Sequence, residues 1–208
     1  MKLIVFGATG SVGTQILNQA LDRGHNVTAF TRNPEKLSSL SRPGLKILKG
    51  DICDSTTVES AIRQQDSVLC AIGDGNKGIV RAEGTKNIIS AMKKTGVTRV
   101  ICQTTLGLGE SRGNLNFFWK HIMFGLLLKK AFQDHELQEQ HLLRSGLDYT
   151  IVRPGAFIDG RITRNYSVGF DGSYKSLNLK IARADVADFM LQQLESSEYL
   201  RKAVSISN

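Results

Sequence analysis

Long hydrophobic runs are the first feature that this 208-residue sequence lacks. No apolar stretch approaches the ~20 residues that a helix needs to span a bilayer, so the sequence predicts no transmembrane segment. The N-terminal run KLIVF is only five residues long and leads into a glycine turn, which is typical of a first strand and not of a secretion signal. We therefore expect a cytoplasmic protein.

Cysteine is also scarce, with three residues, Cys53, Cys70 and Cys102. Because their number is odd and they lie in or beside apolar stretches, we expect buried, reduced thiols and no disulfide framework. No cysteine pair has metal-ligand spacing, and the four histidines form no ligand motif, so the sequence predicts no metal site.

Negative charge is in short supply, since 19 Asp and Glu stand against 27 Lys and Arg, a net charge of +8. The basic residues are spread along the chain, and no helix-turn-helix, zinc finger or aromatic–basic RNA signature is present. We therefore expect no nucleic-acid partner. A spread positive charge also suits a small polyanionic ligand such as a dinucleotide.

What the sequence does contain is an alternation of short β-rich runs and helical patterns. The expected strands cover 2–6, 26–30, 45–50, 67–72, 98–105, 147–155 and 203–207. The expected helices cover 11–24, 54–64, 79–96, 131–145 and 183–196. Asp54 or Ser55 is expected to cap the second helix, and Gly96 to end the third. Alternation of this kind predicts βαβ units with strands buried on both faces. The predicted fold class is α/β, a doubly wound and mostly parallel Rossmann sheet in a single domain over residues 1–208.

Three glycines follow the first strand in the stretch GATGSVG. In a doubly wound fold Gly7 can take the tight turn, Gly10 lets the backbone approach a pyrophosphate, and Gly13 lets the helix pack close to the strand. The spacing is G-x-x-G-x-x-G and not the common G-x-G-x-x-G, and turn glycines alone are the alternative interpretation. With the N–H groups at the start of the helix, this loop supplies the first cofactor-binding candidates: Gly7, Thr9, Gly10, Ser11 and Val12.

The end of the second strand distinguishes NAD from NADP. NAD sites place a carboxylate there for the ribose 2′-hydroxyl, whereas NADP sites use a basic residue for the 2′-phosphate. This strand ends in TRNPEKL, with Arg32 at its tip, Lys36 a turn later and no acid at the tip. The pattern favours NADP, with two solvent-facing cations as the alternative.

Several longer stretches carry a resemblance to a known family: FGATGSVG, TRNPEKL, GDICD, AIGDG, EGTKNIISAMKKTGVTRVICQTT, DHELQEQHLLRSGLDYTIVRPG and RADVADFML. Together they resemble the atypical short-chain dehydrogenase/reductases that include NmrA-like proteins and biliverdin reductase B, also called flavin reductase. The resemblance covers nearly the whole chain and is weakest over 106–131 and 156–180, which border the substrate site in such proteins.

The resemblance implies an NADP-binding fold and hydride transfer from NADPH. It places Asp51 and Ile52 at the adenine. The other cofactor positions that it implies run from the adenosine ribose and pyrophosphate to the nicotinamide: Ala71, Ile72, Gly73, Thr104, Thr105, Pro154, Gly155 and Ala156.

Catalytic residues are sparse. Most short-chain dehydrogenases use a Tyr-x-x-x-Lys pair for proton donation, and none of the four tyrosines here is followed four residues on by Lys. The biliverdin reductase B type also lacks that pair. Thr105 matches its serine and is the catalytic candidate, with a strand-end cap as the alternative. Gly155 stands where the family carries an active-site histidine, which weakens a specific tetrapyrrole prediction.

The helix expected over 131–145 carries further titratable groups. His135 matches a helix histidine of the family, although a lone helical histidine is more often a packing or surface residue. Glu136 and Glu139 are expected to be solvated charges on the same helix.

The stretch NLNFFWKHIMFGLLLKK, residues 114–130, is the most unusual part of the sequence. One interpretation is an aromatic lid over the nicotinamide, with Phe118, Trp119 and Lys120 at the substrate. A loop-helix packed on the sheet edge or on a dimer partner is the second, and contact with an anionic lipid surface is the third.

The function predicted from the sequence is an NADPH-dependent reductase of a planar conjugated acceptor, a flavin or a bilin, acting as a monomer or weak homo-oligomer. The alternative is an NmrA-like NADP-binding redox sensor without turnover. A third class is an isomerase or assembly factor that uses the fold as a scaffold.

Overall fold

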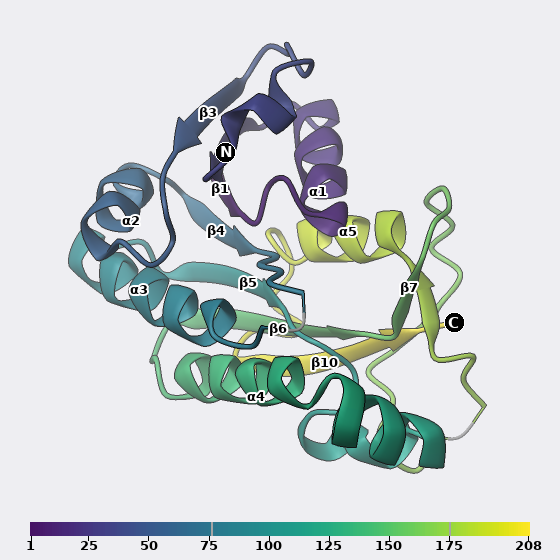
Figure 1. Ribbon diagram of the computed structural model, residues 1–208. Helices are drawn as coiled ribbons and strands as arrows, with labels where there is room; N and C mark the ends of the chain where they lie inside the picture. Colours follow the sequence, from purple (N-terminus) through teal and green to yellow (C-terminus); the bar gives the residue numbers. More distant parts are fainter. Residues whose placement is uncertain (76, 175) are drawn as a thin grey trace.

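The computed structural model describes residues 1–75, 77–174 and 176–208, and an eight-stranded sheet forms its centre (Figure 1). The strands of this sheet are β1 (Lys2–Phe6), β2 (Asn26–Thr31), β3 (Leu45–Lys49), β4 (Ser67–Cys70), β5 (Arg99–Gln103), β6 (Asp148–Pro154), β8 (Ser167–Val168) and β10 (Lys202–Ser207). Their order is β3-β2-β1-β4-β5-β6-β10-β8. Neighbours run parallel except β8, which is antiparallel to β10. The order reverses between β1 and β4, at the switch point where doubly wound sheets bind ligands.

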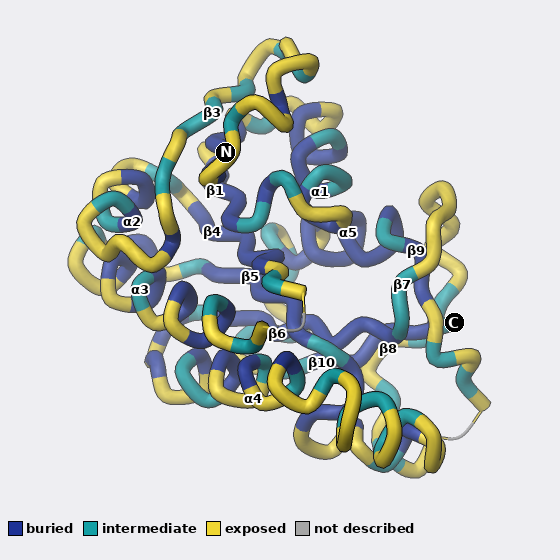
Figure 2. The backbone as a smooth tube through the Cα atoms, viewed as in Figure 1, coloured by how far each residue is buried: buried dark blue, intermediate teal, exposed yellow. Residues whose placement is uncertain are grey.

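Helices cover both faces of the sheet, which confirms the predicted Rossmann-like fold. On one face lie α1 (Ser11–Asp22) and α5 (Arg183–Gln192), and on the other α2 (Ser55–Ile62), α3 (Val80–Thr95) and α4 (Lys129–Leu143) (Figure 1). Apart from the edge strands β3 and β8, the strands of this sheet are buried along most of their length, and the outward helix surfaces are exposed (Figure 2). The sheet is therefore the middle layer of three.

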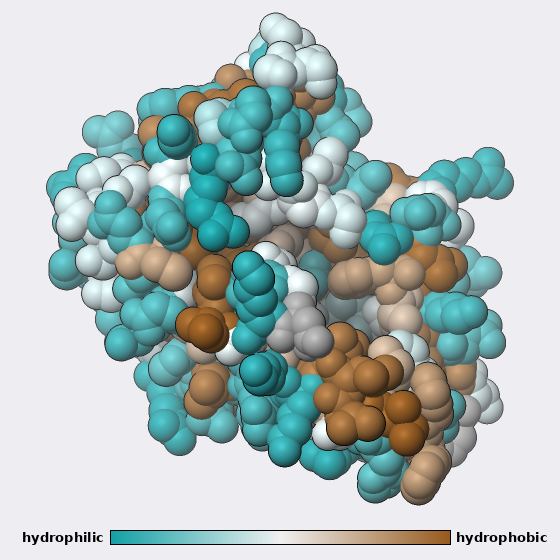
Figure 3. Space-filling view, in the orientation of Figure 1, coloured by the Kyte–Doolittle hydropathy of each residue, from teal (hydrophilic) through white to brown (hydrophobic). Residues whose placement is uncertain are grey.

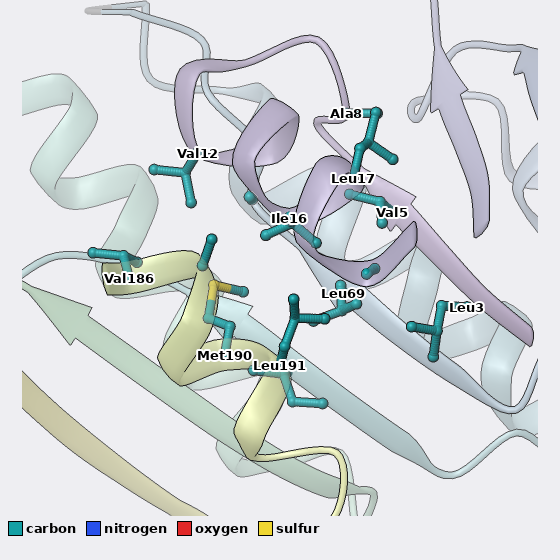
Figure 4. Packing of buried hydrophobic residues seen from close by; sticks show 14 of the residues in the cluster. Leu3, Val5, Ala8, Val12, Ile16, Leu17, Leu69, Val186, Met190 and Leu191 are labelled. Atoms are coloured by element: carbon teal, nitrogen blue, oxygen red, sulfur yellow. The ribbon is translucent and has the colours of Figure 1, made fainter. Parts of the chain in front are cut away.

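The apolar periodicity of the helices produces one core on each face. Ile16 and Leu17 of α1 pack with Met190 of α5 above Val5 and Leu69 of the sheet (Figure 4). On the other face a second cluster joins α2, α3 and α4 to the opposite side of the same strands. Side chains alternate between the two clusters along β1, as expected from a strand repeat of two residues.

Two predicted helix ends are confirmed. Asp54 is the N-cap of α2, and its carboxylate accepts hydrogen bonds from the N–H groups of Thr56 and Thr57 at 3.0 and 3.3 Å. Gly96 ends α3 with φ at +79°, in the left-handed region that glycine adopts without strain. Both ends are local, so the sequence was sufficient to locate them.

The structure contains elements that the sequence pattern did not predict. They are the short helices η1 (Pro34–Leu37) and η2 (Gly109–Asn114), the π-helix η3 (Phe118–Leu127), the strand β8 and the parallel pair β7 (Ala156–Ile158) and β9 (Lys180–Ala182). Most are too short to show a hydrophobic period. The π-helix has a repeat that differs from the 3.6 residues sought in a helical pattern.

One cysteine prediction is wrong. Cys70 and Cys102 are buried and reduced, on the paired strands β4 and β5, as expected. Cys53 is exposed, because it lies in the turn between β3 and α2, where Ile52 takes the buried position.

Candidate functional site

A cleft runs along the carboxyl ends of the parallel strands and consists of two adjoining hollows. The outer hollow, of about 270 Å³, is lined by Gly7, Thr9, Gly10, Phe30, Thr31, Arg32, Asn33, Lys36, Gly50, Ile52, Ile72, Gly73 and Val80. The inner hollow, of about 310 Å³, is lined by Gly10, Ser11, Val12, Ala71, Ile72, Gly73, Arg81, Gln103, Thr104, Thr105, Leu106, Leu115, Trp119, Phe124, Leu128, His135, Pro154, Gly155, Ala156, Phe157 and Leu179. The hollows share Gly10, Ile72 and Gly73, so a long ligand can extend through both.

The glycine loop between β1 and α1 forms the junction of the two hollows. Gly7 has φ at +83°, and a Cβ there would lie 2.2 Å from the Ala71 carbonyl oxygen. A Cβ on Gly13 would lie 2.0 Å from the Gly7 carbonyl oxygen. These two glycines are therefore required by the packing of the chain itself. A Cβ on Gly10 would meet the Gly7 oxygen at 3.1 Å and would stand at the wall of both hollows.

The start of α1 suits an anionic group. Gly10 is its N-cap, and no side chain caps this terminus. The first N–H groups of an α-helix have no partner within the helix, and the helix dipole adds positive potential there. Ser11 and Val12 of the first turn line the inner hollow beside Gly10. The loop thus fits a phosphate or pyrophosphate group of a ligand.

The outer hollow carries positive charge beyond the tip of β2. Arg32 and Lys36 both line it, and no Asp or Glu is among the lining residues of the described chain. Ile52 and Phe30 supply apolar surface on the same hollow. Asp51 lies outside the lining, where its carboxylate accepts a hydrogen bond from the Cys53 N–H at 2.9 Å. The outer hollow can therefore hold a nucleotide base between its apolar surfaces and a phosphate group near its two cations.

The floor of the inner hollow comes from the ends of β4, β5 and β6. Gly155 follows β6 in a crowded place, because a Cβ there would lie 2.8 Å from the Leu179 carbonyl group. The Ala156 N–H donates to the Leu179 carbonyl oxygen at 2.7 Å and holds the two segments together. A histidine cannot replace Gly155 without moving the 179 segment, which gives a physical reason for the departure from the family pattern.

The outer wall of the inner hollow is apolar and aromatic. Leu115, Trp119, Phe124 and Leu128 line it, and the rings of Trp119 and Phe124 lie 5.6 Å apart. Of the three predicted substrate residues, only Trp119 is in this lining. Phe118 is exposed, and Lys120 lines a separate surface hollow with Arg112 and Lys129. Residue 175, within the predicted substrate segment 156–180, lies outside the described residues.

His135 of α4 lines the inner hollow in a defined tautomer. Gln138 Nε2 donates to Thr85 Oγ1 at 2.9 Å, so its Oε1 is the acceptor for His135 Nδ1, 3.0 Å away. Nδ1 then carries the hydrogen, and Nε2 is left as an acceptor. Burial, together with the charge of Arg81, lowers the pKa of His135 to about 4. The imidazole is therefore neutral near pH 7.

Arg81 is a buried lining residue that the sequence reasoning missed. Its Nη2 donates to the Gly75 carbonyl oxygen at 3.0 Å, and its Nη1 lies 3.4 Å from the Asp134 carboxylate. Asp134 also accepts from the backbone N–H groups of Arg81 and Ala82. A cation in the first turn of a helix is destabilised by the helix dipole. This unfavourable position was the sequence signal that could have marked Arg81 as a site residue.

A buried ion pair lies beneath the inner hollow and corrects the prediction for Glu139. Glu139 accepts from Arg153 Nε and Nη2 at 2.9 and 2.7 Å and from Thr104 Oγ1 at 2.7 Å. It is buried rather than solvated, because α4 packs this residue against β6; Glu136 is exposed as expected. Thr105 is partly buried, and its hydroxyl donates to the Leu106 carbonyl oxygen at 3.3 Å.

The fold, the glycine loop and the paired hollows define a dinucleotide-binding α/β protein. Comparison with known families agrees, since residues 7–197 match the family described as NAD(P)H-binding. The chain belongs to this NAD(P)H-binding family.

Curated relatives share the domain and not always the length. The photosystem II assembly factor Ycf39 of Synechocystis is 29% identical over 99% of this chain and 62% of its own length. An uncharacterised chloroplast protein of Arabidopsis thaliana is 33% identical over 94% of this chain and 74% of its own length. The pea chloroplast protein TIC 62 is 31% identical over 74% of this chain, which covers only 32% of that protein.

Solved structures confirm the fold along the full chain. The oxidoreductase YlbE from Lactococcus lactis has a TM-score of 0.84 at 22% identity, with 100% of this chain and 91% of that one covered. ChuY from Escherichia coli O157:H7, described as an anaerobilin reductase, has a TM-score of 0.83 at 27% identity, with coverage of 100% and 97%. A short-chain dehydrogenase/reductase from Veillonella parvula, solved with NADP, has a TM-score of 0.82 at 16% identity, with coverage of 100% and 94%.

Proposed function

We propose that the protein is an NADPH-dependent oxidoreductase that transfers a hydride to a planar conjugated acceptor such as a flavin or a bilin. The observation that carries this proposal is the inner hollow. Trp119 and Phe124 line it together with Thr105 and Pro154, the strand ends where the family resemblance places the nicotinamide. The description of ChuY as an anaerobilin reductase supports a bilin or a similar acceptor.

The cleft fits the dinucleotide on the geometry of its own residues. The uncapped start of α1 at Gly10 offers N–H groups to the pyrophosphate, and Arg32 with Lys36 offers two cations to a 2′-phosphate. These cations, and the lack of a carboxylate among the described residues that line the outer hollow, favour NADPH over NADH. When bound, NADPH supplies the hydride.

The residues of the inner hollow suit an acceptor that needs orientation more than acid–base help. Trp119 and Phe124 can stack on a planar ring system and exclude water from it. Neutral His135 can accept a hydrogen bond from a ring N–H at Nε2, and the Thr105 hydroxyl, whose own hydrogen is directed at the Leu106 carbonyl oxygen, can accept another. Orientation of two reactants by itself lowers a barrier substantially. The proton that accompanies the hydride then comes from water.

The direct test is anaerobic NADPH oxidation with FMN, riboflavin, biliverdin and a quinone, with a secondary alcohol plus NADP as the negative substrate. We expect oxidation with at least one conjugated acceptor and little reaction with the alcohol. The Gly10→Val protein serves as the control for reduction that does not use the cleft. Tight NADPH binding without oxidation by any of these acceptors would contradict the proposal.

A redox sensor that binds NADPH without turnover is the second candidate. One observation favours it: no Tyr-x-x-x-Lys pair occurs in this sequence. A sensor predicts the same cofactor affinity with no acceptor-dependent oxidation. The assay above therefore separates the two functions.

A further inference from the structure

The π-helix η3 and the residue before it carry an apolar patch that the protein itself does not cover. The patch consists of Phe117, Phe118, Ile122, Leu126 and Leu127, which are 73%, 52%, 38%, 70% and 53% exposed. No residue of η3 is buried. Hydrophobic atoms gather over this segment at the lower right of the face shown in Figure 3. A contiguous patch of large apolar side chains is typical of an interaction surface.

The charged side chains within the segment that carries the patch are all basic, and the exposed Glu136 of α4 lines a surface hollow with Lys120 and Lys129. Residues 111–133 contain no Asp or Glu, and they contain Arg112, Lys120, Lys129 and Lys130. Lys129 and Lys130 are exposed at the start of α4, directly after η3. The whole chain has 19 acidic residues for 27 Lys and Arg, so the bias over this segment is much stronger than the average.

The segment has two different sides. Trp119, Phe124 and Leu128 line the inner hollow, whereas Phe117 and Leu126 face away from the protein body. Such a helix has an apolar side directed outward and cations beside it. No helix in the described part of the chain is both long enough and apolar enough to span a bilayer. The patch can therefore lie on a membrane without crossing it.

We propose that η3 and the start of α4 dock the protein on a membrane surface that carries anionic lipid. Aromatic and leucine side chains insert at the boundary between headgroups and acyl chains, and flanking lysines interact with negative headgroups. A second copy of this chain fits less well. Pairing two such patches face to face would bring the lysines of one copy against those of the other.

The apolar part of the proposal is tested by co-sedimentation with vesicles of phosphatidylcholine alone and with vesicles that contain phosphatidylglycerol. We expect binding to the anionic vesicles only. The double variant Phe117→Ser with Leu126→Ser removes one exposed aromatic ring and one exposed aliphatic side chain. It should weaken this binding roughly 100-fold, about tenfold for each side chain. The control is Leu143→Ser, which is 50% exposed at the other end of α4 and should bind as the unmodified protein does.

The charge part is tested by Lys129→Gln with Lys130→Gln, against Lys86→Gln with Lys93→Gln on the exposed side of α3. Each lysine lost from the patch should weaken binding by about fivefold at low salt, and the α3 pair should have little effect. Calorimetric NADPH affinity, measured for every variant, shows that the cleft is intact.

The proposal is overturned by no binding to anionic vesicles, by equal binding to neutral ones, or by equal losses in the patch and control variants. Concentration-dependent dimerisation that Phe117→Ser abolishes would assign the patch to a second copy, and would overturn it as well. None of these outcomes depends on turnover, so the proposed reductase function can fail or hold independently.

Discussion

The two hollows of the cleft differ in how the chain builds them. Much of the outer hollow comes from residues close together in sequence, in the turn after β1 and at the tip of β2. The inner hollow joins the ends of β4, β5 and β6 to η3 and α4, and its residues range from Gly10 to Leu179. A site made of short local motifs can be recognised in a sequence, whereas a site gathered from distant segments depends on their packing.

The glycine loop belongs to both hollows, so it should give the largest effect. Gly10→Val would place a branched side chain at the pyrophosphate position and remove two or more charge-assisted hydrogen bonds. We expect NADPH affinity measured by calorimetry to fall by roughly 100-fold or more. The control is Gly160→Ala, whose Cβ would make an ordinary contact at 3.5 Å. A folded Gly10→Val protein with normal affinity would show that the loop does not bind the dinucleotide.

Arg32 tests the outer hollow alone. Arg32→Ala removes a charge-assisted contact worth ~1.5–3 kcal/mol, so NADPH affinity should fall by roughly 10- to 100-fold. NADH affinity should change little, because NADH has no 2′-phosphate. Arg63→Ala, at an exposed position after α2, is the matched control. Equal affinities of the unmodified protein for NADPH and NADH would contradict the assignment of Arg32.

His135 tests the inner hollow through stability and not through binding. Its pKa is lowered to about 4 in the folded protein, from an ordinary value of 6.5. Between these values the unfolded chain binds more protons, so stability falls as the pH drops from about 6.5 toward 4. From pH 7 to pH 5 this group should cost about 2 kcal/mol of unfolding free energy. His135→Gln should lose correspondingly less stability over the same interval in urea titrations; parallel pH profiles would contradict the burial of a neutral imidazole.

Trp119 and Phe118 form a matched pair for a test of the aromatic wall of the inner hollow. The two rings are adjacent in sequence, but only Trp119 lines the inner hollow. Trp119→Ala should raise the KM for a flavin or bilin by about tenfold, through lost stacking, with NADPH affinity unchanged. Phe118→Ala should leave both values close to those of the unmodified protein. Equal effects of the two substitutions on KM would mean that the wall is not the acceptor surface.

Thr105 should give the smallest effect. Its hydroxyl is engaged with the adjacent Leu106 carbonyl group, and a proton donor of real importance contributes about 10²–10⁴-fold to a rate. We expect Thr105→Ala to lower kcat by only a few-fold, below the ~10² limit of a catalytic acid. Thr105→Ser should restore the rate if the hydroxyl is used at all. A loss of 10³-fold in kcat would make Thr105 a catalytic acid and would contradict hydride transfer without acid–base help.

The sequence by itself determined the layers of the fold and the glycine loop between β1 and α1. Strand and helix periods, the cap at Asp54 and the positive φ at Gly96 are consequences of neighbouring residues. The same holds for the φ angle of Gly7, +83°, which residues with a side chain avoid. Such features depend on interactions within a few residues, so a linear pattern contains them.

Only the tertiary structure decided which side chains line the inner hollow and which lie beneath it or outside it. Glu139 meets Arg153 and Thr104 because α4 packs on β6, and Phe118 turns outward although it adjoins Trp119. Arg81 of α3 lines the inner hollow and is held there by its contact with Asp134. These outcomes depend on how distant elements pack and on the unusual repeat of the π-helix, which shifts the face that each residue presents. No local pattern encodes that choice, because the free energy that decides it comes from contacts formed only when the chain has folded.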